Sequence, residues 1–281
     1  MKSFRLIYFT AVLLLSGSVF AQQEKVVIES SRFAAPLAEK WAEEYEKVNP
    51  GVDIVLIKGN SSDDEVDLSL SSLGNIPAAR FALLPVTNVD NPNLKELNRK
   101  KLNSKDISEL FFVGNVLESS AGSNNTEFDL TVYSGNNSDS FAEAFASHFG
   151  YMKADIKGKR ISGDDIFLVN AIQKDNEGVA FNNLSYIFDV ETRNLKEGLA
   201  IISLDIKNEH IKVLGEETID KAIDLLENES ISHIPIETFG FISEKENNEA
   251  ARFLDWVLTE GQKYNKEYGF LRVSHEHLVN N

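Results

Sequence analysis

The chain has 281 residues, of which 28 are basic and 44 acidic, so its formal net charge at pH 7 is −16, and it has no cysteine. This length, with 42% hydrophobic residues, is enough for one large domain or for two lobes with a sizeable core. The acidity argues against non-specific binding to nucleic acid or anionic lipid. The lack of cysteine excludes disulfides, thiolate catalysis, cysteine-based metal sites and a lipidated N-terminal cysteine.

The first 21 residues have the parts of a secretory signal peptide. Lys2 and Arg5 are basic, residues 6–15 are mostly apolar, and Ser-Val-Phe-Ala ends the segment as a cleavage pattern. An uncleaved anchor helix is the alternative, but the apolar run is too short to span a bilayer. We therefore predict cleavage after Ala21 and a soluble periplasmic protein that does not span the membrane. Cleavage removes two of the 28 basic residues and none of the 44 acidic ones, so the mature charge is −18.

Strands and helices alternate along the mature chain. The helix beginning near Phe33 has apolar residues at spacings of four, four, four and three, and Pro36 fits its first turn. Ser104 is a candidate cap for a later helix. The alternation predicts an α/β fold. Strands are expected at residues 25–29, 52–57, 66–70, 80–86, 128–133, 179–182, 199–206 and 234–242, and helices at 33–48, 103–112, 141–149, 166–174, 218–226 and 247–268, the last interrupted near Gly261.

Two serine-rich turns share one arrangement. At Ser30 and again at Ser134, an apolar strand ends, a turn rich in serine follows, and an amphipathic helix begins. A helix N-terminus offers unpaired N–H groups and partial positive charge, so two such turns facing each other would form a clamp for an anion. Ordinary N-capping by serine and asparagine is the alternative, because these residues are favoured caps anywhere.

Four segments, in order along the chain, carry a family pattern. The first, in residues 30–45, is Ser-Ser-x-Phe-x-x-Pro-Leu with Trp41 and Tyr45. The second is Asn-Pro-Asn-Leu at 91–94, followed by the helix at 102–112, and the third is Gly-Val-Ala-Phe at 178–181. The fourth is FLDWVLTEGQKY at 253–264, followed by Tyr-Gly-Phe at 268–270. Together they resemble the phosphate-binding component of bacterial ABC phosphate importers, a family of type 2 periplasmic binding proteins.

The resemblance implies two α/β lobes joined by a two-strand hinge, with the ligand held in the cleft between them. Lobe I would take residues 24–86 and 238–281, and lobe II residues 90–233. The chain would be an exported solute-binding protein that captures phosphate or a related small oxyanion. It would then pass the ligand to an inner-membrane ABC permease.

The family's pocket can be carried over residue by residue, and it departs from the pattern in lobe II. Ser134 stands where the family has an arginine, and Asp139 replaces a glycine whose amide approaches the ligand. Arg32 is the candidate replacement for the missing countercharge. The ligand-binding residues implied by the resemblance are Ser31, Arg32, Phe33, Ser61, Ser72, Ser138 and Ser140.

Nothing in the sequence indicates an enzyme, a cofactor or a metal site. The motifs of metalloproteases, serine hydrolases and nucleotide-binding loops are absent. The acidic runs Asp63-Asp64-Glu65 and Asp164-Asp165 could bind a cation, but such runs are usually solvated faces, and that is the expectation here. The pocket departures keep a second hypothesis open, in which the chain is a divergent binding-fold protein without phosphate affinity that acts as a periplasmic adaptor or sensor in an envelope complex.

Overall fold

The computed structural model describes residues 24–58, 65–113, 128–138 and 140–273. The expected signal peptide, Ser61 and Asp139 lie outside these ranges. Within them, no helix is long and apolar enough to cross a membrane.

Strands and helices alternate along the described chain. The strands are β1 (Glu24–Ser30), β2 (Val52–Lys58), β3 (Leu68–Ser71), β4 (Ile76–Asn88), β5 (Thr131–Gly135), β6 (Lys159–Ile161), β7 (Gly178–Asn183), β8 (Leu199–Ile201) and β9 (Ile236–Ser243). The helices are α1 (Ala35–Val48), α2 (Leu94–Lys100), α3 (Ser104–Phe111), α4 (Ala142–His148), α5 (Ile166–Lys174), α6 (Leu184–Ile187), α7 (Asn208–Glu216), α8 (Ile219–Asn228) and α9 (Asn248–Leu258), with 3-10 turns η2 (Lys153–Asp155) and η3 (Glu260–Tyr268).

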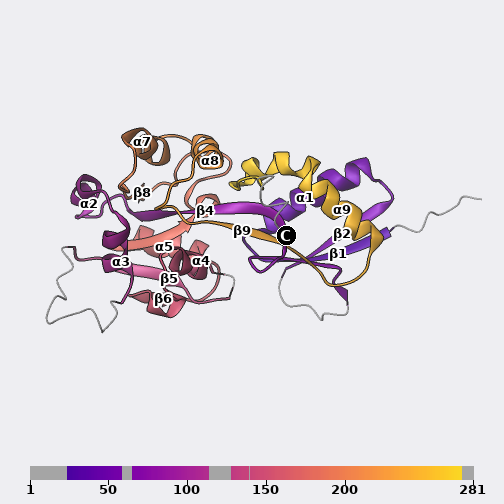
Figure 1. The fold of residues 1–281 in the computed structure, drawn as a ribbon, viewed down its shortest axis with the longest axis horizontal. Helices are drawn as coiled ribbons and strands as arrows, with labels where there is room; N and C mark the ends of the chain where they lie inside the picture. The colour runs from indigo at the N-terminus through magenta and orange to yellow at the C-terminus, as the bar shows by residue number, and fades with distance from the viewer. Residues whose placement is uncertain (1–23, 59–64, 114–127, 139, 274–281) are drawn as a thin grey trace, which may run out of the picture.

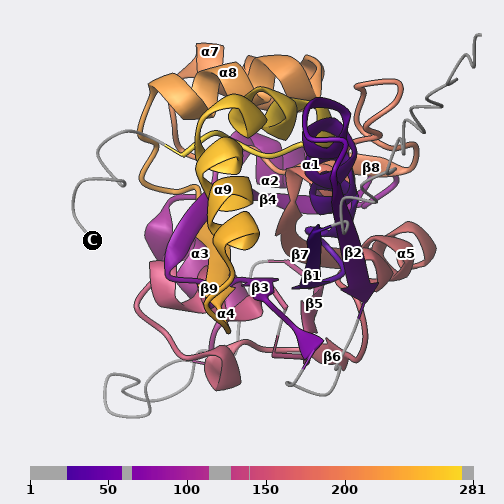
Figure 2. The same cartoon turned by 90° about the vertical axis from the view of Figure 1, so that its right-hand side faces the viewer.

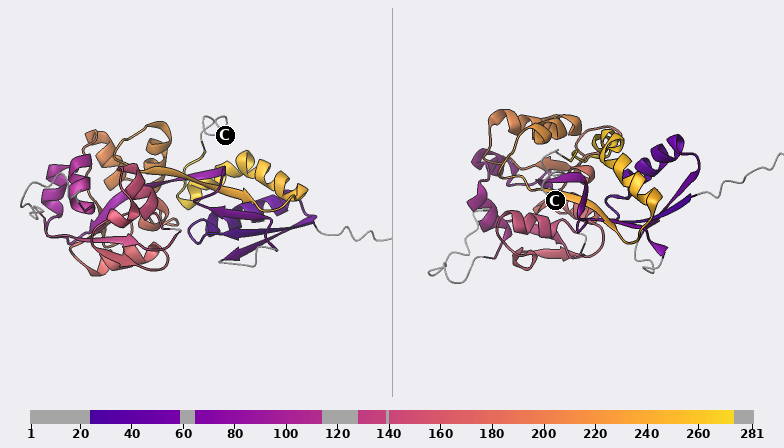
Figure 3. Two further views of the ribbon diagram at one scale, coloured as in Figure 1. Left: turned by 60° about the horizontal axis from the view of Figure 1, so that its bottom comes forward. Right: turned by 45° about the vertical axis from the view of Figure 1, so that its right-hand side comes forward.

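The strands form one sheet in the order β2-β1-β3-β9-β4-β7-β5-β6, with β8 also paired to β4. The long strand β4 changes partner along its length, pairing with β9 up to Ala82 and with β7 from Leu83. As a result, β4 and β9 run between two α/β lobes, which confirms the expected two-strand hinge (Figure 1, Figure 3). The residue limits of the lobes given by the sequence remain a prediction.

In lobe I, helices α1 and α9 cover one face of the strands, while in lobe II, α8 and α4 lie on opposite sides of β4 (Figure 1, Figure 2). Trp41 of α1 is fully buried and donates its indole N–H to the Gly261 carbonyl at 3.0 Å. Trp256 of α9 packs against Tyr45 with ring centroids 5.5 Å apart.

The opposite face of the lobe I sheet carries a row of side chains from three neighbouring strands. Side chains alternate between the two faces of a strand, and on this face Glu29, Ser69 and Ile242 lie in register.

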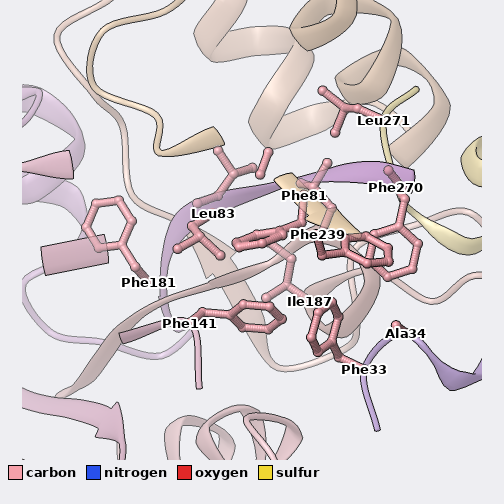
Figure 4. Packing of buried hydrophobic residues seen from close by; sticks show 14 of the residues in the cluster. Phe33, Ala34, Phe81, Leu83, Phe141, Phe181, Ile187, Phe239, Phe270 and Leu271 are labelled. Carbon is pink, nitrogen blue, oxygen red and sulfur yellow. The ribbon is translucent and has the colours of Figure 1, made fainter. Parts of the chain in front are cut away.

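An aromatic cluster joins the two lobes at the level of the hinge strands. Phe33, just before α1, stacks edge-on against Phe141, just before α4, with centroids 5.1 Å apart. Phe81 of β4 and Phe239 of β9 complete the cluster, each within 6.1 Å of Phe33 (Figure 4). Edge-to-face ring pairs add to the burial energy, so this cluster fixes the starts of α1 and α4 beside each other.

Some local expectations from the sequence are wrong. Ser104 does not cap α3; the cap is Asn103, which accepts from the amides of Lys105 and Asp106, while the Asp106 carboxylate accepts the Asn103 amide in return. The strand expected to reach residue 206 ends at Ile201. The short elements α2, β6, α6 and the helix α7 were not anticipated.

Candidate ligand-binding cleft

A cleft of about 450 Å³ opens between the two lobes. Its lobe I wall comes from the end of β1, the turn before α1, and strands β3 and β9. Its lobe II wall comes from the turn before α4, the segment before α5, and α6. The lining residues are Glu29, Ser30, Ser31, Arg32, Phe33, Ser69, Leu70, Ser71, Asn137, Phe141, Gly163, Asp164, Asp165, Tyr186, Ile242 and Glu244.

The turn before α1 gives the lobe I wall its hydrogen-bond donors. The Ser31 hydroxyl is buried and has no hydrogen-bond partner in the part of the chain that the structure describes. The backbone amides of Arg32 and Phe33 find no acceptor within the described residues, and neither does the exposed Arg32 guanidinium. These groups stand at the start of a 14-residue helix, where the backbone dipole favours negative charge. This wall can therefore receive an anionic group.

On the opposite wall, which belongs to lobe II, the side-chain carboxylate of Asp165 accepts a backbone hydrogen bond. One oxygen of the Asp165 carboxylate, Oδ2, accepts the amide of Phe141 at 2.7 Å, and the residue is only 5% exposed. Asn182 holds the Asp165 carbonyl at 2.9 Å. The other oxygen, Oδ1, is buried and has no hydrogen-bond partner among the residues that the structure describes. It lies against Gly135, where a Cβ atom would come within 2.2 Å of it. Burial raises the pKa of Asp165 from 3.8 to about 6, although the Phe141 amide opposes this shift.

Asp164, the neighbour of Asp165, is also engaged by the protein. Its carboxylate accepts the amide of Ile166 at 3.0 Å and the hydroxyl of Tyr186. Burial and this hydrogen bond raise the pKa of Tyr186, so the phenol stays protonated and donates. The lobe II wall thus carries two carboxylates, each held by a backbone amide.

No known protein-family profile matches the chain, and no curated protein matches it. Solved structures do. A Clostridium perfringens protein assigned as a phosphate ABC transporter substrate-binding protein, with bound phosphate, is 16% identical, aligns over 89% of this chain and 100% of its own, and has a TM-score of 0.56. An ABC-type phosphate transport receptor from Vibrio cholerae is 13% identical over 89% of this chain and 100% of its own, with a TM-score of 0.57. The OxyR2 regulatory domain of Vibrio vulnificus is 10% identical over 84% of this chain and 95% of its own, with a TM-score of 0.51.

This chain has the type 2 periplasmic-binding-protein fold. Three of the ligand residues expected from the sequence, Ser31, Arg32 and Phe33, lie together on the cleft of this fold. Ser72 is exposed and does not line it. Strand alternation instead places Ser69 and Ser71 on the cleft side, one residue out of step with the expectation.

The remaining expected residues belong to the turn before α4. Ser138 is exposed and lies outside the lining. The Ser140 hydroxyl is buried next to Gly135, behind the cleft surface, and finds no hydrogen-bond partner within the described ranges. Ser134, at the position of the family's arginine, accepts from the Arg160 guanidinium at 2.9 Å. Arg160 also donates to the carbonyls of Ala154 and Ile156 and does not line the cleft, so it does not replace the missing arginine.

The expectation that Asp164-Asp165 is a solvated face is wrong, because Asp165 is buried and both residues line the cleft. Their position indicated part of this arrangement, because both residues stand directly before α5, where acidic side chains commonly accept hydrogen bonds from backbone amides. No local pattern in the sequence indicates that Asp165 accepts a hydrogen bond from the turn before α4, 24 residues away. Among the described residues, no group of three or more histidine or acidic side chains could hold a metal ion.

Proposed function

We propose that this chain is an exported solute-binding protein that holds a small ligand by an anionic group, phosphate or a related oxyanion, in the interlobe cleft. It would release the ligand to an ABC permease of the inner membrane. The observation that carries the proposal is the set of unused donors on the lobe I wall: the Ser31 hydroxyl, the amides of Arg32 and Phe33, and the Arg32 guanidinium.

The physical support is local. The Ser31 hydroxyl is buried, and buried donors without partners are uncommon in native proteins; a ligand that accepts from this hydroxyl removes its desolvation penalty. Hydrogen bonds that involve a charged group are about twice as strong as neutral ones, so Arg32 gives the wall its largest single contribution. Closure of the lobes about β4 and β9 would then remove the ligand from water, as in other hinged binding proteins.

The test is calorimetric titration of the mature chain, residues 22–281, with phosphate and with sulfate. We expect Arg32→Ala to weaken binding roughly ten- to a hundredfold and Ser31→Ala by several-fold, because a charged and a neutral hydrogen bond are lost. Arg99→Ala is the matched control, since Arg99 pairs on the surface with Glu96 and does not line the cleft. The absence of heat and of a thermal shift at millimolar phosphate would remove the oxyanion assignment.

A second candidate is a divergent binding-fold protein without phosphate affinity, serving as a periplasmic adaptor or sensor. The acidity of the cleft favours it: Glu29, Asp164, Asp165 and Glu244 line the cleft, against Arg32 as the one cation among its described lining residues. Affinity capture from native membranes separates the two candidates. If the chain binds no oxyanion and an envelope complex is recovered with it, the adaptor or sensor is supported. If it binds an oxyanion tightly and no protein is captured, the solute-binding protein is supported.

A further inference from the structure

On the lobe II wall, the Asp165 carboxylate takes up the backbone amide of Phe141, a donor that would otherwise be open to a ligand's anionic group. Both Asp165 and its donor, the amide of Phe141, line the cleft. The rings of Phe33 and Phe141 are in contact, with centroids 5.1 Å apart, so the turns before α1 and α4 lie beside each other at the cleft. The carboxylate therefore provides, from within the chain, the negative charge that a ligand would bring.

The surroundings hold this carboxylate in place. Gly135 leaves room for Oδ1, because any side chain there would collide with Asp165 and Ser140. Asn182 fixes the backbone of Asp165 from β7 at 2.9 Å. Contacts from three separate segments thus position one buried charge, although removing a charge from water without an ionic partner is unfavourable. Such a destabilising arrangement is characteristic of functional sites.

We propose that Asp165 is the specificity-determining residue of the cleft, a tethered anion that excludes oxyanions from the lobe II wall and confines a ligand's anionic group to the turn before α1. This inference rests on the proposed function, because it concerns which ligands the same cleft accepts. A fixed carboxylate repels an approaching oxyanion strongly where water is scarce and screening is weak.

Sulfate titrations of Asp165→Asn test the proposal. The asparagine oxygen can still accept the Phe141 amide, so this variant removes the charge and keeps the hydrogen bond. We expect it to bind sulfate about tenfold or more tightly than the wild-type chain at neutral pH. The matched control, Asp255→Asn, removes a charge from an exposed residue of α9 that does not line the cleft; we expect a change of less than about threefold, because solvent and salt screen this charge.

The pH dependence of sulfate affinity distinguishes a charge effect of Asp165 from a purely structural role, because a structural role would not change with pH. Sulfate stays fully ionised from about pH 8 to about pH 5, whereas Asp165 takes up its proton in this interval. Wild-type affinity for sulfate should therefore rise on acidification, and the affinity of Asp165→Asn should stay nearly level. The other titratable or charged groups around Asp165 are Asp164 beside it, Lys153 of η2, and Tyr186 of α6 with Arg32 near its ring.

The outcomes separate this inference from the proposed function. If the wild-type chain binds no oxyanion and Asp165→Asn does, the inference stands and the oxyanion assignment fails. If the wild-type chain binds tightly and Asp165→Asn binds no better, the inference fails and the function stands. Equal gains in Asp165→Asn and Asp255→Asn would also overturn the inference, because a general effect of net charge would then explain both. Binding by neither the wild-type chain nor Asp165→Asn would overturn both proposals.

Discussion

At the scale of single residues, the Asp165 charge should lower the stability of the folded chain near neutral pH. Its pKa is about 6 in the folded protein and near 3.8 when the group is free in water. The native state therefore holds the proton more tightly, and the wild-type chain loses stability as the pH rises from about 4 to about 6. The difference of roughly two pKa units corresponds to about 3 kcal/mol.

We expect Asp165→Asn to raise the unfolding free energy at pH 7 by up to about 3 kcal/mol. The unfolding curves of the two proteins should converge near pH 4, where the wild-type carboxyl is also neutral. Urea denaturation at a series of pH values measures this difference. A constant difference at all pH values would show that the change acts through packing and not through the charge.

The positions of cleft residues were predictable from the sequence only where the local segment determines them. Ser31, Arg32 and Phe33 line the cleft as expected because strand, turn and helix follow one another directly around them, while their part in ligand binding stays a prediction. Ser72 was misplaced because β3 ends at Ser71 and Ser72 lies in the exposed turn that follows, an end point that the sequence pattern does not mark. Asp165 was misjudged because its main partner belongs to a separate segment, and no local pattern records that contact.

At the scale of elements, the pairing of β4 with β9 depends on a close backbone approach at Gly240. A Cβ atom there would lie 2.1 Å from the Ile76 carbonyl oxygen and 3.0 Å from the Pro77 Cα, both of them backbone atoms. A register shift between Pro77 and Ala79 lies at this same point of the ladder. The hinge strands therefore tolerate no side chain here without moving apart.

Gly240→Ala should lower the unfolding free energy by about 1–3 kcal/mol or more, because the strands must separate to admit the methyl group. Gly215→Ala is the matched control, since Gly215 lies in helix α7 and has open space around it. That substitution should raise stability by about 0.5–1 kcal/mol, as alanine favours helix over glycine. Chemical denaturation of both variants checks the pair, and a Gly240→Ala protein as stable as wild type would contradict the close approach.

Elements with a long apolar period were predictable from the sequence, as α1 shows. Its spacings of four and three marked the buried face that includes Leu37, Trp41 and Tyr45. The short elements lack such a signal: β6 has three residues and α6 four, and their positions are set by packing in lobe II. Helix α7 was missed because only His210 and Leu214 of its nine residues are buried.

At the scale of the whole molecule, Arg193 ties the C-terminal turn η3 to helix α8. It has a left-handed backbone (φ 65°), which is uncommon for a residue with a side chain. Its guanidinium forms a two-pronged contact with Asp220 of α8, at 2.9 and 3.1 Å, and donates to the carbonyls of Lys266 and Glu267. Nearby, Lys266 pairs with Asp224, and Arg272 pairs with Glu227.

Arg193→Ala should lower the unfolding free energy by about 2–3 kcal/mol, because several charged hydrogen bonds are lost at once. Arg193→Lys should restore little of it, since an ammonium group cannot reproduce the planar fork. The urea midpoint measures both variants. Lys105→Ala removes an exposed ion pair with Glu109 and should change stability by less than about 1 kcal/mol. A loss of the same size in Lys105→Ala and Arg193→Ala would refute the special role of Arg193.

The positions of the two tryptophans have a consequence for spectroscopy. The chain has two of them, Trp41 on α1 and Trp256 on α9, and both pack in lobe I, away from the cleft lining. Indole emission therefore reports the melting of lobe I alone, while far-ultraviolet circular dichroism follows the helices of both lobes. Coincident transitions by these two probes would show that the hinge strands couple the lobes into one cooperative unit, and separate transitions would give the stability of each lobe.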